Sequence, residues 1–570
     1  MTETAYKVSV NDRAYTSWIF HYADSHNEIA ELPDISPLGC KLFSGDTFSL
    51  NNGVHTLISS PTRDNVHAGI LILDSGRTYG RLGRRLLYKC IPDDRCLPPF
   101  LVPYEIKAAF SKATKNKFII FRFMDWSAGH PNGEIADTLG DVDDMNAFYE
   151  YQIWRNKLHI NINDFIKKTG RAIHDSGGEA ALINTILANP NFKIDDYRDI
   201  DNVFSIDPDT STDFDDAFSV NYIENGLLRV NIYIANVFVW LETLGLWSSF
   251  AGRVSTIYLP DKKRPMLPGL LSDGVCSLKQ GADRFAFMMS ATFDECGNLI
   301  DTPIFKNVII RVSKNFAYEE SALKKSQSYR ILHNITKLLD KNVVDSHDVV
   351  AFWMIYMNHW SAVKLSLYGV GIFRGTIGDG GGTVSESSTN LGFSDDVMRV
   401  IKAWSKDGDG SYASYSNNVI AHSDLNLTSY THITSPIRRI VDLINQILFF
   451  TSSGLVSTIS ADADAFLNKW NALLPVINAH VKSIRRTQMD CELLQRCKDI
   501  DAEKQFRGVI IDCCSVDCGF YEYTVYLEEL KLLAKVRSVD LLGVHSVAMF
   551  SMFMFDDEDK LYKKVRLQMV

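Results

Sequence analysis

Short runs of alternating apolar and polar residues recur in three parts of the chain. They appear over residues 41–103, for example in HAGILIL from His67, then in KFIIFRFMDW from Lys117, and finally in GVIIDCC and YEYTVYLEE after Arg507. Alternation of this kind predicts strands with one buried face. Because glycines and asparagines separate the runs, each part is predicted to form a small β-barrel.

The centre of the chain follows a different pattern. LLRVNIYIANVF, which starts at Leu227, is apolar and β-branched enough for a buried strand. The apolar segment over residues 347–369 predicts a mostly buried helix, a helix and a linker are expected over 150–200, and further helices over 458–506. This mixture predicts an α/β domain in the centre of a multidomain α+β chain.

Length and charge narrow the class of protein. With 570 residues, of which 46% are hydrophobic, the chain is long enough for roughly three to five globular domains. Its net charge is -10 and its pI is near 5.8, which argues against a protein that coats nucleic acid over its whole surface. A local basic channel stays compatible with these values.

The cysteines and the apolar segments predict a reduced, soluble protein. None of the ten cysteines forms the paired C-x-x-C units of a structural zinc site, so reduced thiols are expected. No basic and then apolar leader opens the sequence, and the longest apolar stretch, Val547 to Phe555, is too short to span a bilayer. We therefore expect a cytoplasmic protein without membrane association.

The stretch from Asp199 to Leu228 holds seven aspartates, one glutamate and no Lys or Arg. Four of the acids lie in a predicted loop between two apolar runs, namely Asp207, Asp213, Asp215 and Asp216. Carboxylates crowded onto one turn repel each other and raise their pKa values unless a cation joins them. Oxygen ligands suit Mg²⁺ or Mn²⁺, and a site this rich in carboxylates can hold two ions. The alternative is a solvated acidic loop, against which the tight apolar flanks argue.

A second motif, YTHITSPIRRIVDL, runs from Tyr430 to Leu443. Ser435 followed by a proline predicts the start of a helix. Arg438 and Arg439 would then lie in its first turn, where free N–H groups already attract an anion and arginine adds a bidentate fork for phosphate. Asp442, four residues after Arg438, is expected to pair with it.

These motifs together resemble a known enzyme family. Asp207 opens a D-P-x-x-x-x-D-x-D-D-A pattern, and R-x-S-x-x-Y-L-P from Arg253, M-L-P from Met266 and C-S-L from Cys276 follow in order. With the motif from Tyr430, they resemble the ribonuclease II (RNB) family of 3′→5′ exoribonucleases. The resemblance implies a short form of the family without an N-terminal endonuclease domain.

The resemblance also implies an order of domains. A central mixed α/β RNB catalytic domain is expected between small OB-fold β-barrels, two of them N-terminal and cold-shock-like and one C-terminal. The expected divisions are an N-terminal extension over 1–40, cold-shock-like barrels over 41–103 and 104–163, the RNB domain with its preceding linker over 164–500, and a C-terminal RNA-binding barrel over 501–570.

Several further residues are expected to contact RNA. The resemblance implies that Tyr258 is a clamp aromatic that stacks on the 3′ end, that Tyr318 lies near the active site, and that Arg374 and Arg439 bind RNA. Arg85 belongs to a basic group in the first predicted barrel. That group is either a groove for a single strand or a solvated basic face.

The activity that the resemblance implies is metal-dependent, processive 3′→5′ hydrolysis of single-stranded RNA to nucleoside 5′-monophosphates by a monomer. The four acids would hold two Mg²⁺ ions and Arg438 would neutralise the scissile phosphate. Two residues depart from the family pattern, because Asn236 stands where an Asp is usual and Phe352 where a Glu is expected. These departures leave two alternatives, an RNA-binding protein that does not cut and a metal-dependent DNA hydrolase.

Overall fold

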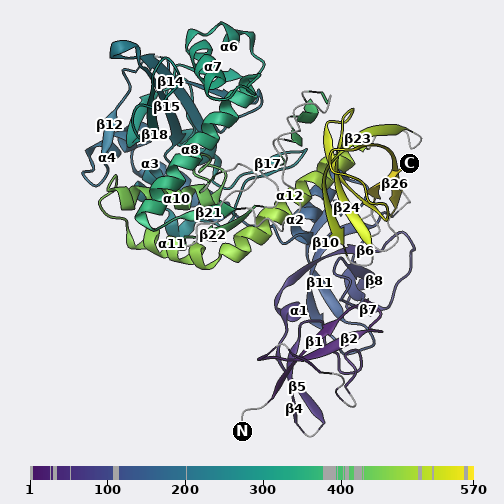
Figure 1. Ribbon diagram of the computed structural model, residues 1–570. Helices are drawn as coiled ribbons and strands as arrows, with labels where there is room; N and C mark the ends of the chain where they lie inside the picture. The colour runs from purple at the N-terminus through teal and green to yellow at the C-terminus, as the bar shows by residue number, and fades with distance from the viewer. Residues whose placement is uncertain are drawn as a thin grey trace. The chain divides into compact units, whose positions relative to one another are not determined.

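The computed structural model describes most of the chain. The described residues are 4–106, 114–375, 393–394, 396–398, 400–401, 404, 410–415, 427, 429–497, 504–516, 519–556 and 563–570, apart from residues 26, 30, 31, 33, 34, 52 and 201. The chain divides into two compact units (Figure 1). One comprises Met1–His159, Leu259–Asp261 and Arg486–Val570, and the other comprises Ile160–Tyr258 and Lys262–Arg485.

The first unit begins with a five-stranded antiparallel sheet. Its strands are β1 (Ala5–Val10), β2 (Trp18–Tyr22), β3 (Glu28–Ile29), β4 (Thr47–Asn51) and β5 (Val54–Ser59), in the order β3-β2-β1-β4-β5. Alternation along β1 buries Val8 and Val10, so this strand needs a partner on each side. Residues 1–40, predicted as an extension, thus contribute three strands to a sheet.

A closed barrel follows in the same unit. Its strands are β6 (Val66–Leu71), β7 (Arg81–Leu82), β8 (Arg85–Pro92), β9 (Phe100–Tyr104), β10 (Lys117–Asp125) and β11 (Asn132–Asp141). Because β6 pairs with both β10 and β8, the ring β6-β10-β11-β9-β8 closes. Gly69 permits the closure, since a Cβ there would lie 2.8 Å from Cys90 Sγ. Strands from the two predicted ranges 41–103 and 104–163 therefore share one barrel.

The two N-terminal sheets share one hydrophobic core. Phe43, which precedes β4, stacks on Trp126 at the end of β10 with ring centroids 4.8 Å apart. Two short helices belong to this unit, α1 (Pro61–Asp64) and α2 (Met145–Arg155). In α2, Tyr151 stacks on Phe118 of the barrel at 4.3 Å. This core joins strands from both sides of residues 40 and 103.

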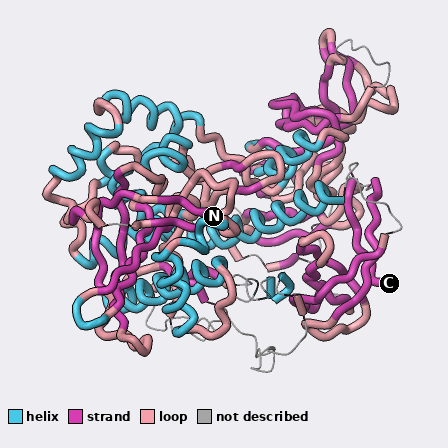
Figure 2. Tube along the Cα trace, turned by 90° about the horizontal axis from the view of Figure 1, so that it is seen from above, coloured by secondary structure: helices cyan, strands magenta, loops and turns pink. Residues whose placement is uncertain are grey.

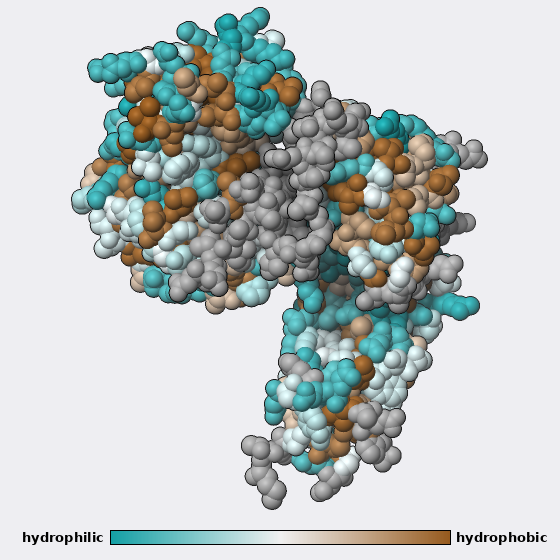
Figure 3. All heavy atoms as spheres, viewed as in Figure 1, coloured by the Kyte–Doolittle hydropathy of each residue, from teal (hydrophilic) through white to brown (hydrophobic). Residues whose placement is uncertain are grey.

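The C-terminal part of the first unit is a second barrel-like sheet. Its strands are β23 (Gln505–Val516), β24 (Phe520–Leu527), β25 (Leu532–Ser538), β26 (Val547–Asp556) and β27 (Lys563–Met569), in the order β25-β24-β23-β26-β27. The outer strands β25 and β27 also contact each other, which confirms the predicted C-terminal barrel. Figure 3 shows apolar atoms on its outside, and Val547, Met549 and Phe553 are at least 40% exposed.

The second unit is built on a seven-stranded mixed sheet. Its strands are β12 (Ile194–Asp196), β13 (Phe204–Asp207), β14 (Asp216–Tyr222), β15 (Leu228–Ala235), β18 (Asp283–Phe293), β19 (Ile304–Arg311) and β20 (Lys314–Ala317), in the order β12-β19-β18-β15-β14-β13-β20. The pairs β12–β19 and β13–β20 are parallel and the others antiparallel. Two small hairpins lie apart from it, formed by β16 (Ile257–Tyr258) with β17 (Lys263–Arg264) and by β21 (Ile372–Gly375) with β22 (Ser411–Ser414).

Helices accompany this sheet, as Figure 2 shows from above. They are α3 (Asn163–Asp175), α4 (Glu179–Ala188), α5 (Val237–Thr243), α6 (Ser321–Lys325), α7 (Gln327–Leu339), α8 (Ser346–Tyr368), α10 (Ile440–Ser453), α11 (Ala461–Ala472) and α12 (Leu474–Cys497), the last of which continues into the first unit. Phe449 and Phe450 of α10 pack on Phe287 of β18 at 4.9 and 5.0 Å. The predicted mixed α/β centre is confirmed.

The predicted helix over residues 347–369 is confirmed by α8. Asp345 and Asp348 form a capping box at its start, and Gly369 ends it with a φ of 71°. The helices expected over 458–506 correspond to α11 and α12. Among the described residues, no helix has both the length and the apolar character that a bilayer crossing requires.

Candidate active site

The predicted acidic loop connects two neighbouring strands of the seven-stranded sheet. Asp207 is the last residue of β13 and Asp216 is the first residue of β14, and these strands run antiparallel. The antiparallel pairing therefore holds the two carboxylates at the same end of the sheet. The loop is fixed from outside, because Phe214 N–H donates to Ser277 Oγ at 2.9 Å and Leu278 N–H donates to the Phe214 carbonyl at 3.0 Å.

Asp207 and Asp216 form a pair of half-buried carboxylates, each with one buried oxygen atom that no donor of the described chain reaches. In both residues this atom is Oδ2. Burial, joined by the charge of Asp215, raises the pKa of Asp207 to about 7. Burial and the charges of Asp207 and Asp215 raise the pKa of Asp216 well above its usual range. Such a pair requires a proton or a cation.

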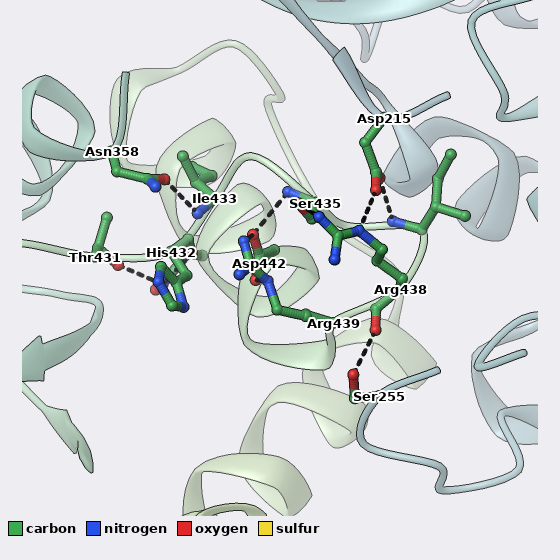
Figure 4. A network of polar contacts seen from close by, with 12 residues as sticks. Asp215, Ser255, Asn358, Thr431, His432, Ile433, Ser435, Arg438, Arg439 and Asp442 are labelled. Carbon is green, nitrogen blue, oxygen red and sulfur yellow. Dashed lines mark hydrogen bonds and ion pairs between the residues drawn. The ribbon is translucent and has the colours of Figure 1, made fainter. Parts of the chain in front are cut away.

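Asp215 already has a cationic partner in the protein. Its Oδ2 accepts from Arg438 Nε at 2.9 Å (Figure 4). Its Oδ1 accepts from the Ile437 N–H at 3.1 Å. The two partners lie 223 residues apart in the sequence. Burial still raises the pKa of Asp215 to about 6, although Arg438 and the Ile437 N–H lower it. Arg438 therefore contacts one acid of the loop directly.

Asp213 is paired with a lysine that the sequence analysis did not single out. Nζ of Lys263 lies 2.9 Å from Asp213 Oδ1, 2.7 Å from Asp273 Oδ1 and 2.6 Å from Thr212 Oγ1. Partial burial lowers the pKa of Lys263, but hydrogen bonds to Asp273 and Asp213 outweigh this effect and raise it. The basic triplet at residues 262–264 lies between the Y-L-P and M-L-P motifs, and it was the available signal for this contact.

The predicted helix start at Ser435 is wrong. Helix α10 begins only at Ile440, because residues 254–256 pair with the backbone before it. Thr256 N–H and Ser255 Oγ donate to the Arg438 carbonyl, and Ile440 N–H donates to the Val254 carbonyl. The Ser435 carbonyl accepts from the Arg438 and Arg439 N–H groups and closes a single turn. The bonds to residues 254–256 hold the backbone of residue 439 extended, so this turn does not continue into the helix.

The predicted pair between Asp442 and Arg438 is wrong for the same reason. Asp442 instead holds Arg439 through two bonds, from Nε at 2.9 Å and from Nη2 at 2.8 Å. Its Oδ1 also accepts from the Ser435 N–H at 2.7 Å (Figure 4). Asp442 is fully buried, and it therefore fixes the turn that presents Arg438 to Asp215.

The segment before this turn is fixed from two helices. Asn358 of α8 donates to Tyr430 Oη at 3.1 Å and accepts from the Ile433 N–H at 3.0 Å. Asn445 of α10 donates to Thr431 Oγ1 at 2.7 Å and to the His432 carbonyl at 3.0 Å. The buried side-chain amides of Asn358 and Asn445 thus satisfy hydrogen-bonding groups of the irregular backbone that leads to Arg438.

Two of the predicted aromatic residues lie close to the acids. Tyr258 of β16 is 42% exposed, and the charges of Arg438, Asp213 and Asp215 act on its hydroxyl. Tyr318 follows β20, and its N–H donates to the Asp207 carbonyl at 3.2 Å. The Tyr318 ring stacks on His347 at 3.7 Å. Both rings are therefore placed beside the carboxylates.

A cavity of about 460 Å³ adjoins Tyr318. It lies where β20, α6, α7 and the start of α8 meet, and its lining mixes aromatic, cationic and acidic side chains. The lining residues are Tyr318, Glu319, Lys324, Tyr329, Arg330, His333, Asn334, Val344, Asp345, Ser346 and His347. A volume of this size accommodates a nucleotide-sized group.

The remaining predicted residues have other surroundings. Arg374 is 2% exposed and lies over the ring of Tyr412 at 5.5 Å. Arg85 is the exposed first residue of β8 in the other unit. Asn236 caps α5, accepting from the Val239 N–H and donating to Asn307. Phe352 stacks on Tyr356 within α8. The amide of Asn236, where the family usually has an Asp, is thus explained by its bonds to the start of α5 and to Asn307.

Asp207 and Asp216 fit a hard divalent cation. Their Oδ2 atoms are buried and lack hydrogen bonds within the described structure, and burial raises the pKa of both carboxyls. A bound cation would relieve these conditions. Asp213 and Asp215 already hold Lys263 and Arg438. Among the described residues, no three His, Cys, Asp or Glu side chains converge as a metal site, which leaves a two-carboxylate platform.

A sequence model of the RNB domain matches residues 194–340 and 410–451, which include the four acids and Arg438. These two segments of the chain carry an RNB domain. Ribonuclease R of Chlamydia pneumoniae is 29% identical over 327 residues, which cover 46% of this chain and 48% of that protein. The chain thus spans about half the length of the Ribonuclease R sequences that it matches.

Solved structures show the same fold as this RNB-domain protein. RNase R of Mycoplasma genitalium in complex with ribose-methylated single-stranded RNA superposes with a TM-score of 0.67 at 16% identity, covering 99% of this chain and 100% of that chain. Yeast Ssd1, described as a pseudonuclease, superposes with a TM-score of 0.54 at 14% identity, covering 96% of this chain and 80% of that chain. At these identities the likeness extends to the fold only.

Proposed function

We propose that this RNB-domain protein is a metal-dependent, processive 3′→5′ exoribonuclease that releases nucleoside 5′-monophosphates from single-stranded RNA. The observation that carries the proposal is the half-buried pair Asp207 and Asp216 beside Arg438, in which each carboxylate has one buried oxygen atom that no donor of the described residues reaches. When bound, Mg²⁺ or Mn²⁺ would supply an activated water and stabilise the leaving oxygen. The four carboxylates could hold the two ions that the sequence predicts if Asp213 released Lys263 and Asp215 released Arg438.

The protein's own groups would position the scissile phosphate. Asp207 and Asp216 would hold the cation, and Asp215 orients the Arg438 guanidinium through Nε. Nη2 of Arg438 donates to Ser435 Oγ at 3.0 Å, so its other N–H groups can face a phosphate. The Arg438 side chain is 41% exposed, as a residue that binds substrate must be. Its charge would stabilise the negative charge that develops during hydrolysis.

A second candidate function is RNA binding without cleavage. Phe352 in place of a glutamate and the fold shared with the pseudonuclease Ssd1 favour it. Asn236 no longer supports this function, since it caps α5 and bonds Asn307. The intact acid pair and the adjacent Arg438 favour cleavage, because a binding protein has no need of two buried carboxylate oxygens without partners.

The proposed activity predicts a stepwise, metal-dependent product pattern. A single-stranded RNA labelled at its 5′ end is incubated with the protein in Mg²⁺ or in EDTA. We expect a ladder that shortens from the 3′ end to a short final product in Mg²⁺, and no shortening in EDTA. Binding without shortening in Mg²⁺ would identify the non-cleaving protein instead. DNA of the same sequence, run alongside, tests the alternative of DNA hydrolysis.

If Tyr258 stacks on a base, its removal should lower the affinity for RNA and leave the rate of the cleavage step unchanged. Stacking on an aromatic ring contributes about 1 to 3 kcal/mol per base, so Tyr258→Ala should weaken RNA binding about 5- to 100-fold. The dissociation constant is measured in EDTA by fluorescence anisotropy, which separates it from cleavage. Tyr258→Phe should bind normally, and so should Tyr222→Ala, in which a 67% exposed tyrosine of the same unit is removed. Normal affinity of Tyr258→Ala would contradict the stacking role.

A further inference from the structure

Lys263 is held by three oxygen atoms at the edge of the acid loop. Its ammonium lies within 2.6 to 2.9 Å of Thr212 Oγ1, Asp273 Oδ1 and Asp213 Oδ1. Oxygen ligands on several sides of a compact positive charge are also what a hard metal cation requires. The Lys263 side chain is 25% exposed and that of Asp213 is 10% exposed, so water screens this pair only in part.

The charges of the site come close to balance with one divalent cation. Besides the exposed Asp209, the acid loop holds four carboxylates, and Asp273 lies next to it. Two protein cations pair with three of these five acids, Arg438 with Asp215 and Lys263 with Asp213 and Asp273. Of the three negative charges that remain, two belong to Asp207 and Asp216, whose Oδ2 atoms are buried. One divalent ion neutralises them, whereas a second would bring excess positive charge next to an ammonium.

We propose that the Lys263 ammonium occupies the place of a second metal ion, so that this site binds one divalent cation where the acid motif alone would provide for two. The inference rests on the proposed function in one respect, that Asp207 and Asp216 bind a divalent cation. Lys263 is then a positioning residue, because it holds Asp213 and the loop in place without contacting the reacting atoms.

The contacts of Lys263 indicate that its ammonium stays at this position. Asp273 belongs to the turn over Leu270–Val275, and Thr212 belongs to the acid loop itself, so the ammonium joins two segments of the fold. Asp213 also acts electrostatically on both Asp207 and Asp215, so it lies close to these two carboxylates. Removing the ammonium would leave Asp213 and Asp273 available as ligands of a second cation.

The number of bound ions tests the inference directly. Protein freed of metal is titrated with Mn²⁺ without RNA, and the free ion is counted by electron paramagnetic resonance. We expect one Mn²⁺ per chain at saturation for the wild type and two for Lys263→Met. Lys306→Met serves as the matched control, because Lys306 pairs with Asp195 on the same sheet at 2.6 Å and has no part in the acid loop. It should bind one ion.

A further variant tests whether the ion count depends on the Lys263 charge or on the structure around it. Asp273→Asn removes one partner of Lys263 and leaves its pairing with Asp213, so it should still bind one ion. Thermal unfolding in EDTA checks that each variant is folded, and if Lys263→Met is unfolded, Lys263→Gln replaces it. Two ions in the wild type, or one ion in a folded Lys263 variant, would overturn the inference. The ion count does not involve RNA, so a protein that binds one ion but cleaves nothing refutes the proposed function alone.

Discussion

Asp216→Asn is expected to lower the rate of RNA cleavage by about a thousandfold or more. The side chain loses one of the two buried carboxylate oxygens without partners, and therefore half of the platform for the cation. Charge stabilisation by a bound metal is worth several kcal/mol, and each 1.4 kcal/mol changes a rate tenfold. The measurement is the single-turnover rate on 5′-labelled RNA in saturating Mg²⁺, with RNA affinity followed in parallel. Affinity should not fall, because a negative charge near the phosphates is removed.

The same variant should be more stable than the wild type in EDTA. Burial and two neighbouring carboxylates raise the pKa of Asp216, so ionised Asp216 destabilises the metal-free fold. In Mg²⁺ the order should reverse, since the wild type gains the binding energy of the ion. Asp209→Asn is the matched control, because Asp209 is an exposed acid in the same loop. Cleavage by Asp216→Asn within tenfold of the wild-type rate would remove the acid pair from the mechanism.

The acid motif shows how far sequence alone can go. The alternation of apolar residues located the strands on both sides of the loop, and the density of aspartates identified the loop as a site. The sequence could not tell which carboxylates are already paired. That division depends on Lys263 and Arg438, which reach the loop from 50 and 223 residues away. The basic triplet at residues 262–264 and the arginine motif mark the two cations in the sequence, but only the fold decides which carboxylate each cation meets.

The motif at Ser435 shows the opposite case, in which a good local signal is overridden. A serine followed by proline is a strong start for a helix, yet the backbone of residues 438–440 bonds to residues 254–256 and the helix begins at Ile440. The same limit applies to residues 1–40, whose three strands have weak patterns by themselves and are ordered by the core shared with the following barrel. Tertiary partners decided both outcomes.

This displaced helix start gives Arg438 its function in the proposed mechanism. In a first helical turn its guanidinium would point along the helix surface, and its carbonyl would belong to the helix. In the observed turn, its carbonyl bonds to Ser255 and Thr256 while its side chain pairs with Asp215. Backbone and side chain are thus fixed by different segments, which is the preorganisation that electrostatic catalysis requires.

Arg438→Met is expected to lower both activity and stability. Loss of a preorganised donor next to developing charge should slow cleavage about 100- to 1,000-fold. Asp215, which is 3% exposed, would lose its cationic partner, at a cost of about 3 kcal/mol in the free energy of unfolding. This value is the lower end of the usual range, because water reaches the 41% exposed Arg438 side chain and screens the pair. Single-turnover kinetics and urea unfolding measure the two effects.

A double variant separates the two roles of this arginine. Asp215→Asn combined with Arg438→Met removes both charges, so most of the lost stability should return while cleavage stays slow. Arg438→Lys should keep stability near the wild type but cleave about tenfold more slowly, since an ammonium cannot bond Asp215 and a phosphate with the same fork. Arg311→Met is the control, as it breaks an exposed pair with Asp283 and should change little. If the double variant regained the cleavage rate together with stability, Arg438 would serve only to neutralise Asp215, and the phosphate would need another partner.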